Sequence, residues 1–484
     1  MPLLRNIIVV LLVVVFCSCR FNDDIEDLQY DEKDLKTDLK IFKGIVTDMH
    51  AGVYAYNSPK EIDLLFDSIA NSIEGSLDLR SFFKKVDFIV DRIKCIHTTT
   101  YFPAAFYDSI SSRALFFPTP LILIDNKLIV NSDNQNIPLG AEVTKINKYK
   151  AADIIRNLKN YRHTDGNSNL ARHAAINEDF AYDFYLNYGG FKNFDIEYIE
   201  DSSKIIVQKS FYAEKLNTLY DDVSFSSFYK EKKQVAYDLE MDDATQTATI
   251  TLTTFTFETT DGYFAFLHFL ENSFRLIKLS GFKNLIIDCR ENGGGYYDAT
   301  YSTLGYLVNE PLMEFDSAFQ RFKNLSFKEY ISPIDTARIE EYDTAYKIFD
   351  KKSNRLFKLK TEEISKWYPQ QNLFNGNLYV LINGNVASAA STFAAILKDK
   401  TNAVIVGEET GGSNNSHNSA VINFELPHSK LSLAIPLRRY YQPNKKALKD
   451  RGVLPNIQIK QTIKDLINGN DNAMMYIFDS LIAK

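Results

Sequence analysis

The spacing of apolar residues changes along the chain and divides it into regions. In residues 62–73 and 77–96, apolar side chains recur at every third or fourth position. This is the period of an amphipathic helix that buries one face. The pattern therefore predicts a small helical domain, which together with a preceding tether occupies residues 19–111.

Residues 112–235 lose the helical period and carry short apolar runs instead. The runs are rich in β-branched residues and are bounded by Asp, Asn, Pro and Gly, at 121–124, 128–130, 141–146, 194–199 and 204–208. Such runs are typical of strands joined by turns. We expect a β-rich module that is interrupted by one short helix at 151–160.

From residue 236 to residue 484, predicted strands and helices alternate. The strands are expected at 248–252, 284–289, 377–383, 402–407 and 431–437, and the helices at 264–279, 297–308 and 389–398. Alternation of this kind implies crossover connections and a mainly parallel sheet, so the fold class is α/β. The long polar stretch at 309–375 is expected to wrap the outside or to form part of a substrate cleft.

The first residues have the layout of a bacterial export signal. A short basic segment precedes the apolar run at 7–16, which is too short to span a bilayer, and Ser18 and Cys19 follow. A small residue before a cysteine resembles the lipoprotein cleavage box. We expect residues 1–18 to be removed and Cys19 to carry lipid that anchors the chain in the bacterial envelope, at the outer membrane. A plain secretory signal and an uncleaved N-terminal anchor are the alternatives.

Charge and cysteine content exclude several classes of protein. The net charge is −7, from 55 basic and 62 acidic residues, which gives no electrostatic case for nucleic-acid binding. Of the four cysteines, Cys95 and Cys289 remain after the signal region. Two cysteines make neither a disulfide scaffold nor a zinc site, and we expect no metal and no cofactor.

Two junctions of strand, turn and helix carry the candidate chemistry. Ser388 lies between the strand at 377–383 and the helix at 389–398. Taken alone, such a serine is most often a helix cap. Its hydroxyl would also lie at the positive end of the helix, where the Ala389 N–H can point at a developing oxyanion. The glycine turn at 293–295 follows another strand and can offer a second backbone N–H, that of Gly294.

A hydroxyl nucleophile needs a base, and histidine is the usual one. His97 lies where the last helix of the first domain ends and an extended segment begins. His417 and His428 lie near the C-terminal strands and are the competing candidates. A lone histidine is more often a surface or capping residue than a catalytic one.

Several segments form an ordered set of motifs. They are Gly-Ala-Glu-Val-Thr-Lys-Ile-Asn at 140–147, Asp-Cys-Arg-Glu-Asn-Gly-Gly-Gly at 288–295, Ser-Ala-Ala-Ser-Thr-Phe-Ala at 388–394, Val-Gly-Glu-Glu-Thr-Gly-Gly at 406–412 and Arg-Gly-Val-Leu-Pro-Asn at 451–456. In this order they resemble the tail-specific, or C-terminal-processing, proteases of serine peptidase family 41. His97 and Thr98 resemble the Gly-His-Thr of the tricorn-like branch, whose histidine is the base.

The resemblance implies a fold and a mechanism. It implies a crotonase-like α/β catalytic domain at 236–484, preceded by the helical domain and by a PDZ-like domain at 112–235. It also implies cleavage of proteins or peptides through an acyl-enzyme on Ser388, with His97 as base and the N–H groups of Ala389 and Gly294 around the oxyanion. Ser413 stands where the lysine-dyad branch has its lysine, which favours a serine–histidine mechanism.

The chain departs from the family pattern in its acidic residues. The glutamate of the nucleophile motif is replaced by Ser391 or Thr392. The acid that would orient the histidine is therefore open, with Glu408 the first candidate and Asp450 the second. The missing glutamate also supports an alternative, a catalytically weak or inactive lipid-anchored peptide-binding protein. An acyl-CoA enzyme on the same core is disfavoured, because the export signal places the chain where CoA is absent.

Overall fold

The computed structural model describes residues 28–484, apart from 112, 133–136, 201–205, 216–235, 354, 443–450 and 484. The predicted signal peptide, the predicted lipid site Cys19 and the candidate acid Asp450 all lie outside the described residues. None of the helices in the described part of the chain is long and apolar enough to cross a bilayer.

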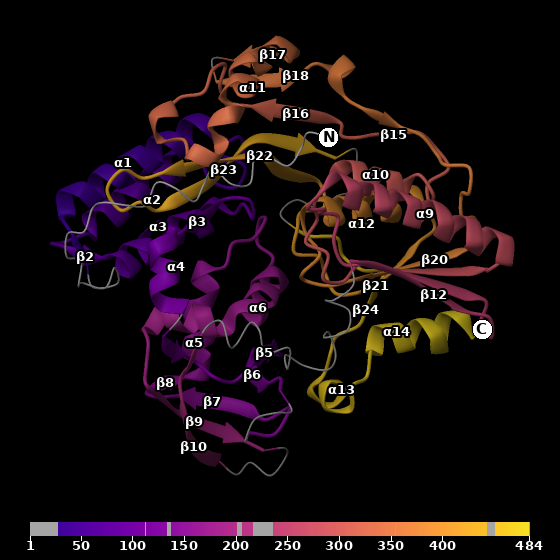
Figure 1. The fold of residues 1–484 in the computed structure, drawn as a ribbon, viewed down its shortest axis with the longest axis horizontal. Helices are drawn as coiled ribbons and strands as arrows, with labels where there is room; N and C mark the ends of the chain where they lie inside the picture. The colour runs from indigo at the N-terminus through magenta and orange to yellow at the C-terminus, as the bar shows by residue number, and fades with distance from the viewer. Residues whose placement is uncertain are drawn as a thin grey trace, which may run out of the picture.

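The predicted N-terminal helices are present as α1 (Glu32–Met49), α2 (Pro59–Asn71) and α3 (Leu79–Ile93). A capping box between Ser58 and Glu61 fixes the start of α2. The apolar stripe of α3 is buried as its spacing predicts. These helices share one core with apolar residues of β22 (Ser416–Glu425) and β23 (Ser432–Tyr441), so the first helices pack directly on strands from the C-terminal region (Figure 1).

The strands β22 and β23 belong to a sheet that the chain assembles from distant segments. Its order is β17-β18-β16-β23-β22, and β3 (Thr99–Tyr101) also pairs with β23. The strands β16 (Ser317–Gln320), β17 (Phe349–Ser353) and β18 (Leu356–Leu359) come from the polar stretch at 309–375. This stretch therefore extends the sheet on which the N-terminal helices pack.

The β-rich region contains the predicted strands in an antiparallel sheet of order β10-β9-β7-β6-β5. They are β5 (Leu121–Ile124), β6 (Lys127–Val130), β7 (Glu142–Ile146), β9 (Asn193–Ile199) and β10 (Ile206–Tyr212). The short helix α5 (Ala151–Leu158) was expected, but α6 (Asn169–Tyr188) was not. A kink at Asp179 breaks the helical period of its apolar face.

The predicted parallel sheet is confirmed in the C-terminal half, but the strand expected at 431–437 is not part of it. That strand is β23, which pairs antiparallel in the other sheet. The order of the parallel sheet is β12-β13-β14-β20-β21-β24, and every pair from β13 to β24 is parallel. The strands are β12 (Tyr237–Asp242), β13 (Thr247–Leu252), β14 (Asn284–Asp288), β20 (Asn377–Ile382), β21 (Val404–Gly407) and β24 (Ile457–Gln458).

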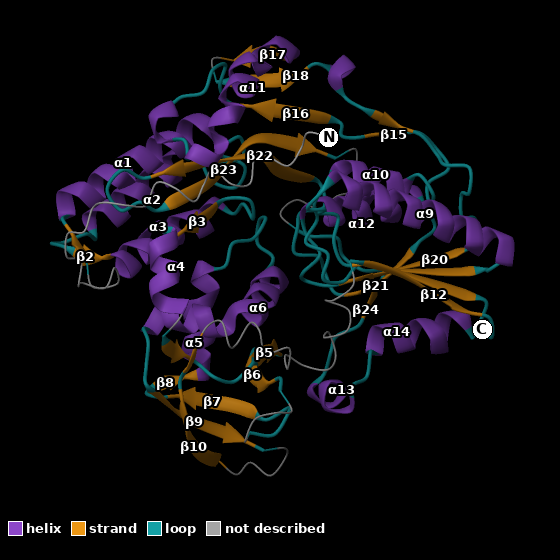
Figure 2. Ribbon diagram, in the orientation of Figure 1, coloured by secondary structure: helices purple, strands orange, loops and turns teal. Residues whose placement is uncertain are grey.

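Helices cover both faces of this sheet. One face carries α9 (Thr260–Ser280), α10 (Tyr297–Leu304) and α12 (Ser388–Lys400), and the other carries α14 (Asn472–Tyr476) (Figure 2). Leu285 and Ile287 of β14 join the core of the first face, whereas Ile286 between them joins the core beside α14. This alternation buries β14 on both sides, which explains its continuous apolar run.

Candidate active site

The two junctions meet at the carboxyl ends of neighbouring strands. The strands β14 and β20 pair in parallel, with Asp288 opposite Leu381. The glycine turn follows β14, and Ser388 follows β20. Glu291 in the first junction accepts hydrogen bonds from the amides of Asn383 (2.9 Å) and Asn385 (2.6 Å) in the second. Parallel pairing and this carboxylate bridge hold the serine beside the glycines, where open α/β sheets usually place their sites.

Ser388 does not act as a helix cap. The capping position of α12 is Ala387, and no side-chain cap bond is made there. Ser388 itself has a φ of 49°, in the left-handed region that residues with a Cβ seldom adopt. Strain of this kind costs on the order of 1–3 kcal/mol and persists where the surroundings impose it, often at functional sites. The capping interpretation of Ser388 is therefore wrong.

The predicted base is within hydrogen-bond distance of the predicted nucleophile. The Nε2 atom of His97 is 3.0 Å from the Oγ atom of Ser388, although 291 residues separate them. This is hydrogen-bond distance for a general base and the proton that it removes. Burial lowers the pKa of His97, and the charge of Asp165 opposes that shift. His97 is therefore neutral and able to accept a proton near pH 7.

A network of buried groups fixes the turn that carries His97. The turn closes through the N–H of Thr98, which donates to the Cys95 carbonyl at 3.0 Å. The Nδ1 atom of His50 accepts from the Gly52 N–H, so its Nε2–H donates to the Oγ1 atom of Thr98 at 2.8 Å. Burial lowers the pKa of His50 to about 3, which keeps this donor ring neutral.

The glycine turn lies against the nucleophile. A Cβ added at Gly294, which has a φ of 107°, would come within 2.8 Å of the Ser388 Cβ and 2.9 Å of the Ala389 nitrogen. Only glycine allows this approach. Asn292 braces the turn: its side-chain oxygen accepts from the Gly294 N–H at 2.9 Å, and its carbonyl accepts from the Ala387 N–H at 3.1 Å.

The two predicted oxyanion donors differ in availability. Ala389 is the second residue of α12 and is fully buried, and an N–H in the first turn of a helix has no intrahelical acceptor. The Gly294 N–H is already bonded to Asn292. Gly293, one residue earlier, lines the cavity beside Ser388. Its N–H is a candidate donor that the sequence pattern did not single out.

The motifs at 406–412 and 451–456 are hydrogen-bonded to each other and support the start of α12, where Ser388 lies. Arg451 binds Glu409 through two hydrogen bonds of 2.8 and 2.6 Å. The N–H of Val453 donates to the Thr410 hydroxyl at 2.8 Å. These bonds hold Gly412 against the start of α12, where an added Cβ would meet the Ser388 nitrogen at 2.7 Å.

The first acid predicted from the motifs, Glu408, has charged neighbours other than His97. Glu408 interacts with the charges of Lys460 and Asp125, and burial raises its pKa. The first candidate acid is therefore corrected: the carboxylate whose charge acts on His97 is Asp165. Asp165 follows His163 in a polar loop before α6, and no motif or period marks it. The second candidate, Asp450, lies outside the described residues.

The competing histidines have other partners. The Nε2 atom of His417 is hydrogen-bonded to the Tyr297 hydroxyl, and burial holds the pKa of His417 well below its usual value. The Nδ1 atom of His428 lies 3.6 Å from Asp34 at the surface. Among the described residues, the histidine that is hydrogen-bonded to Ser388 is His97, which leaves His97 as the candidate base.

A cavity of about 420 Å³ opens beside the two junctions. Gly293, Asn385 and Ala387 line it on the side of the parallel sheet. The remaining wall comes from α3, α6 and the segment around β3, and it includes Phe83, Ile96, Tyr107, Tyr182 and Leu186. Charged side chains line it too, among them Lys84, Asp87, Arg162, Glu178 and Asp183, although more of its surface is apolar than polar. The cavity reaches the turn that bears the candidate oxyanion donors.

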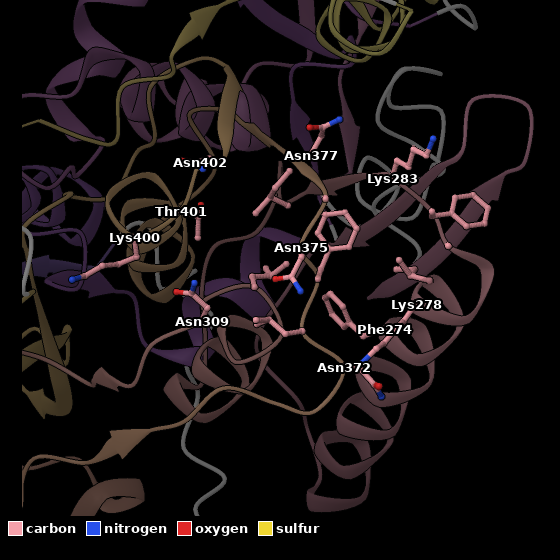
Figure 3. A pocket seen from close by; sticks show the side chains of 18 of the residues that line it. Phe274, Lys278, Lys283, Asn309, Asn372, Asn375, Asn377, Lys400, Thr401 and Asn402 are labelled. Carbon is pink, nitrogen blue, oxygen red and sulfur yellow. The ribbon is translucent and has the colours of Figure 1, made fainter.

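A larger concavity, of about 1030 Å³, lies at the opposite end of the same sheet. Figure 3 shows Lys283, Asn377 and Asn402 around it, which lie at the amino-terminal ends of β14, β20 and β21. The junctions that carry Ser388 and the glycine turn are at the carboxyl ends of these strands, so this concavity is separate from the candidate active site.

Comparison with known proteins agrees with this architecture. Residues 246–459 match the model of peptidase family S41. A tail-specific protease from Haemophilus influenzae is 27% identical over 202 residues, which cover 40% of this chain and 23% of that protein. The match thus spans about a quarter of the length of this relative.

Solved structures show the same fold. Mature CPAF complexed with lactacystin aligns with a TM-score of 0.61 at 13% identity, over 92% of this chain and 97% of that one. Mature CPAF alone aligns with a TM-score of 0.60 at 14% identity, over 92% and 96% of the two chains. The segment that matches the model of peptidase family S41 contains both the glycine turn and Ser388, so the family resemblance covers the candidate active site.

Proposed function

We propose that this chain is a serine endopeptidase that cleaves protein or peptide substrates through an acyl-enzyme on Ser388. The observation that carries the proposal is the 3.0 Å contact between the Nε2 atom of His97 and the Oγ atom of Ser388. It supplies a nucleophile and a base within reach of one another, beside a turn that can bind an oxyanion.

The geometry supports a two-step reaction. The Ser388 oxygen attacks the carbonyl carbon of the scissile peptide bond while its proton passes to His97 Nε2. The N–H of Ala389 and one N–H of the glycine turn stabilise the negative oxygen of the tetrahedral intermediate. The C–N bond then breaks and His97 gives its proton to the departing amine. Water repeats the sequence on the ester and releases the acid.

The mainly apolar cavity supports a peptide as the substrate. Its volume of about 420 Å³ can hold one or two side chains of a peptide. Gly293 and Ala387, which are next to the candidate site, line this cavity. When the scissile carbonyl of a substrate lies near Ser388, a neighbouring side chain of the substrate would enter the cavity. We propose that apolar side chains beside the scissile bond are preferred.

Cleavage mapping tests the proposed function. The chain from residue 20 onward is incubated with an unfolded protein, and the products are sequenced by mass spectrometry. Internal cuts with apolar residues next to the scissile bond are expected. Binding of the substrate without any cut supports the alternative, a peptide-binding protein with this fold, and products trimmed only from the ends contradict endopeptidase action.

We further propose that residues 112–235 form a PDZ-like domain and that residues 236–484 form a crotonase-like catalytic domain. The first proposal is supported by the antiparallel sheet flanked by α5 and α6, and the second by the parallel sheet with helices on both faces. The PDZ-like region lacks a Gly-Leu-Gly-Phe carboxylate loop, so the proposal does not include the binding of free C-termini.

The N-terminal sequence supports attachment to the bacterial envelope through lipid on Cys19. In cells that process lipoproteins, Cys19→Ala is expected to leave an uncleaved precursor without lipid, because the thiol is the acceptor for the lipid. Metabolic labelling with a fatty-acid probe and the mass of the mature N-terminus measure this. Wild-type protein recovered in the soluble fraction with no lipid would contradict the anchor.

A further inference from the structure

The second ring nitrogen of His97 points to a further functional residue. The Nε2 atom contacts Ser388, whereas the buried Nδ1 atom has no hydrogen-bond partner among the described residues. A neutral imidazole that accepts a proton at Nε2 carries its own proton on Nδ1. A buried N–H without an acceptor is costly, so the catalytic tautomer requires an acceptor on this side of the ring.

Asp165 is placed to be that acceptor. One ligand-capable atom from each of Asp165, Cys95 and His97 lies within 4.8 Å of the other two. A carboxylate oxygen of Asp165 therefore lies no more than 4.8 Å from a nitrogen of the His97 ring. The Asp165 side chain is buried, with 3% of the residue exposed.

The Asp165 carboxylate is held by both halves of the site. Its Oδ1 atom accepts from the N–H of Ile96, the residue before His97, at 3.1 Å. Its Oδ2 atom accepts from the Ser413 N–H at 3.5 Å. Ser413 follows Gly412, which packs against the backbone of Ser388. Asp165 therefore links the turn of the base to the loop beneath the nucleophile.

We propose that Asp165 is the positioning acid of this site, which keeps the His97 proton on Nδ1 and stabilises the imidazolium that forms when Ser388 is deprotonated. This inference rests on the proposed roles of Ser388 and His97. It assigns to a loop residue the task that the motifs suggested for Glu408 or Asp450.

The electrostatic surroundings of His97 agree with this role. Among the titratable groups that interact with it, His50 and His417 are neutral because burial lowers their pKa values. Cys95 is a neutral thiol, because burial and the charge of Asp165 raise its pKa to about 11. Arg439, on β23, acts on His50 and His417. Within this group, Asp165 provides the negative charge.

The test combines turnover with a direct titration of His97. In Asp165→Asn, kcat is expected to fall at least about 100-fold, as for the loss of the acid in other triads, with KM within about threefold. Loss of the negative charge destabilises the imidazolium and lowers the His97 pKa, so the acidic limb of the kcat/KM profile moves to lower pH. NMR of ¹³C-labelled histidine, with His97→Gln to assign the signal, measures the same shift without substrate.

Two further variants separate positioning from stability. Asp165→Glu keeps the charge, and its His97 pKa is expected to lie closer to the wild-type value than that of Asp165→Asn. Asp335→Asn is the matched control, since Asp335 is another buried aspartate that accepts a backbone N–H, that of Asn423. It is expected to leave both kcat and the His97 titration unchanged.

The outcomes distinguish this inference from the proposed function. An unshifted His97 titration with wild-type kcat in folded Asp165→Asn overturns the role of Asp165, and so does a loss confined to Asp450→Asn or Glu408→Gln. If Asp165→Asn does not fold, Asp165→Glu is compared with Cys95→Ser, which changes a neutral neighbour of His97. A larger change of the His97 pKa in Asp165→Glu than in Cys95→Ser overturns the role of Asp165. If Asp165→Asn shifts the His97 pKa but the wild-type chain cleaves no peptide, the result supports the pairing of Asp165 with His97 and contradicts the proposed peptidase function.

Discussion

Replacing Ser388 by alanine is expected to lower kcat by a factor on the order of 10⁴–10⁶ while leaving the fold intact. The Oγ atom of Ser388 is the proposed nucleophile. In the pair of Ser388 and His97, it is the group that forms the proposed acyl-enzyme. The residual rate would come from substrate binding and the oxyanion donors. Because the capping position of α12 is Ala387 and the Ser388 hydroxyl contacts His97 instead, the free energy of unfolding should change by no more than about 1 kcal/mol.

Kinetics and thermal unfolding of the same preparation measure both parts of this prediction. Ser391→Ala is the matched control, since Ser391 lies on the same helix and donates to the Val386 carbonyl at 2.9 Å. Loss of this buried hydrogen bond is expected to lower the stability of the fold, while kcat stays within about tenfold. Turnover retained in folded Ser388→Ala excludes Ser388 as the nucleophile, and activity lost only in step with the melting temperature favours a structural role.

Replacing His97 by alanine is the second large effect, again on the order of 10⁴-fold or more in kcat. Wild-type kcat/KM should fall as the pH drops through the His97 pKa, because the imidazolium cannot accept the Ser388 proton. Burial lowers this pKa, so the limb is expected below the ordinary imidazole value of about 6.5. Stopped assays between pH 4 and about 9 measure the limb.

Two other histidines serve as controls for this prediction. His428→Ala removes a surface histidine and should change neither kcat nor the acidic limb. His417→Gln tests the competing base, whose ring is hydrogen-bonded to Tyr297, and should leave the limb in place. Full activity in His97→Ala together with a limb that disappears in His417→Gln would transfer the role of the base to His417.

Local patterns in the sequence predicted the parts of the fold that depend on local physics. The buried run of β14 and the amphipathic stripe of α3 both appear where their periods place them. The kinked α6 did not follow a single period and was missed. The pairing of β16 with β23 was also missed, because a strand from a polar segment gains its partner only from the tertiary fold.

The residues of the candidate site also fall into those that local sequence patterns predicted and those that depend on the tertiary fold. The sequence predicted Ser388, His97 and the glycine turn because each lies between two recognisable secondary-structure elements. The structure brings the three together. Asp165 could not be found, because it lies in a loop and its relation to His97 exists only in three dimensions. Motif spacing likewise could not reveal that Asn292 engages the Gly294 N–H.

Covalent labelling with a fluorophosphonate tests the central claim most directly, since it reports an activated serine without requiring a known substrate. Intact mass and peptide mapping of the wild-type chain at pH 7.5 are predicted to show one adduct, on Ser388, with labelling at least about 100-fold slower in folded His97→Ala. Wild-type protein that remains unlabelled, or that is labelled equally fast without His97, would contradict a serine nucleophile activated by His97.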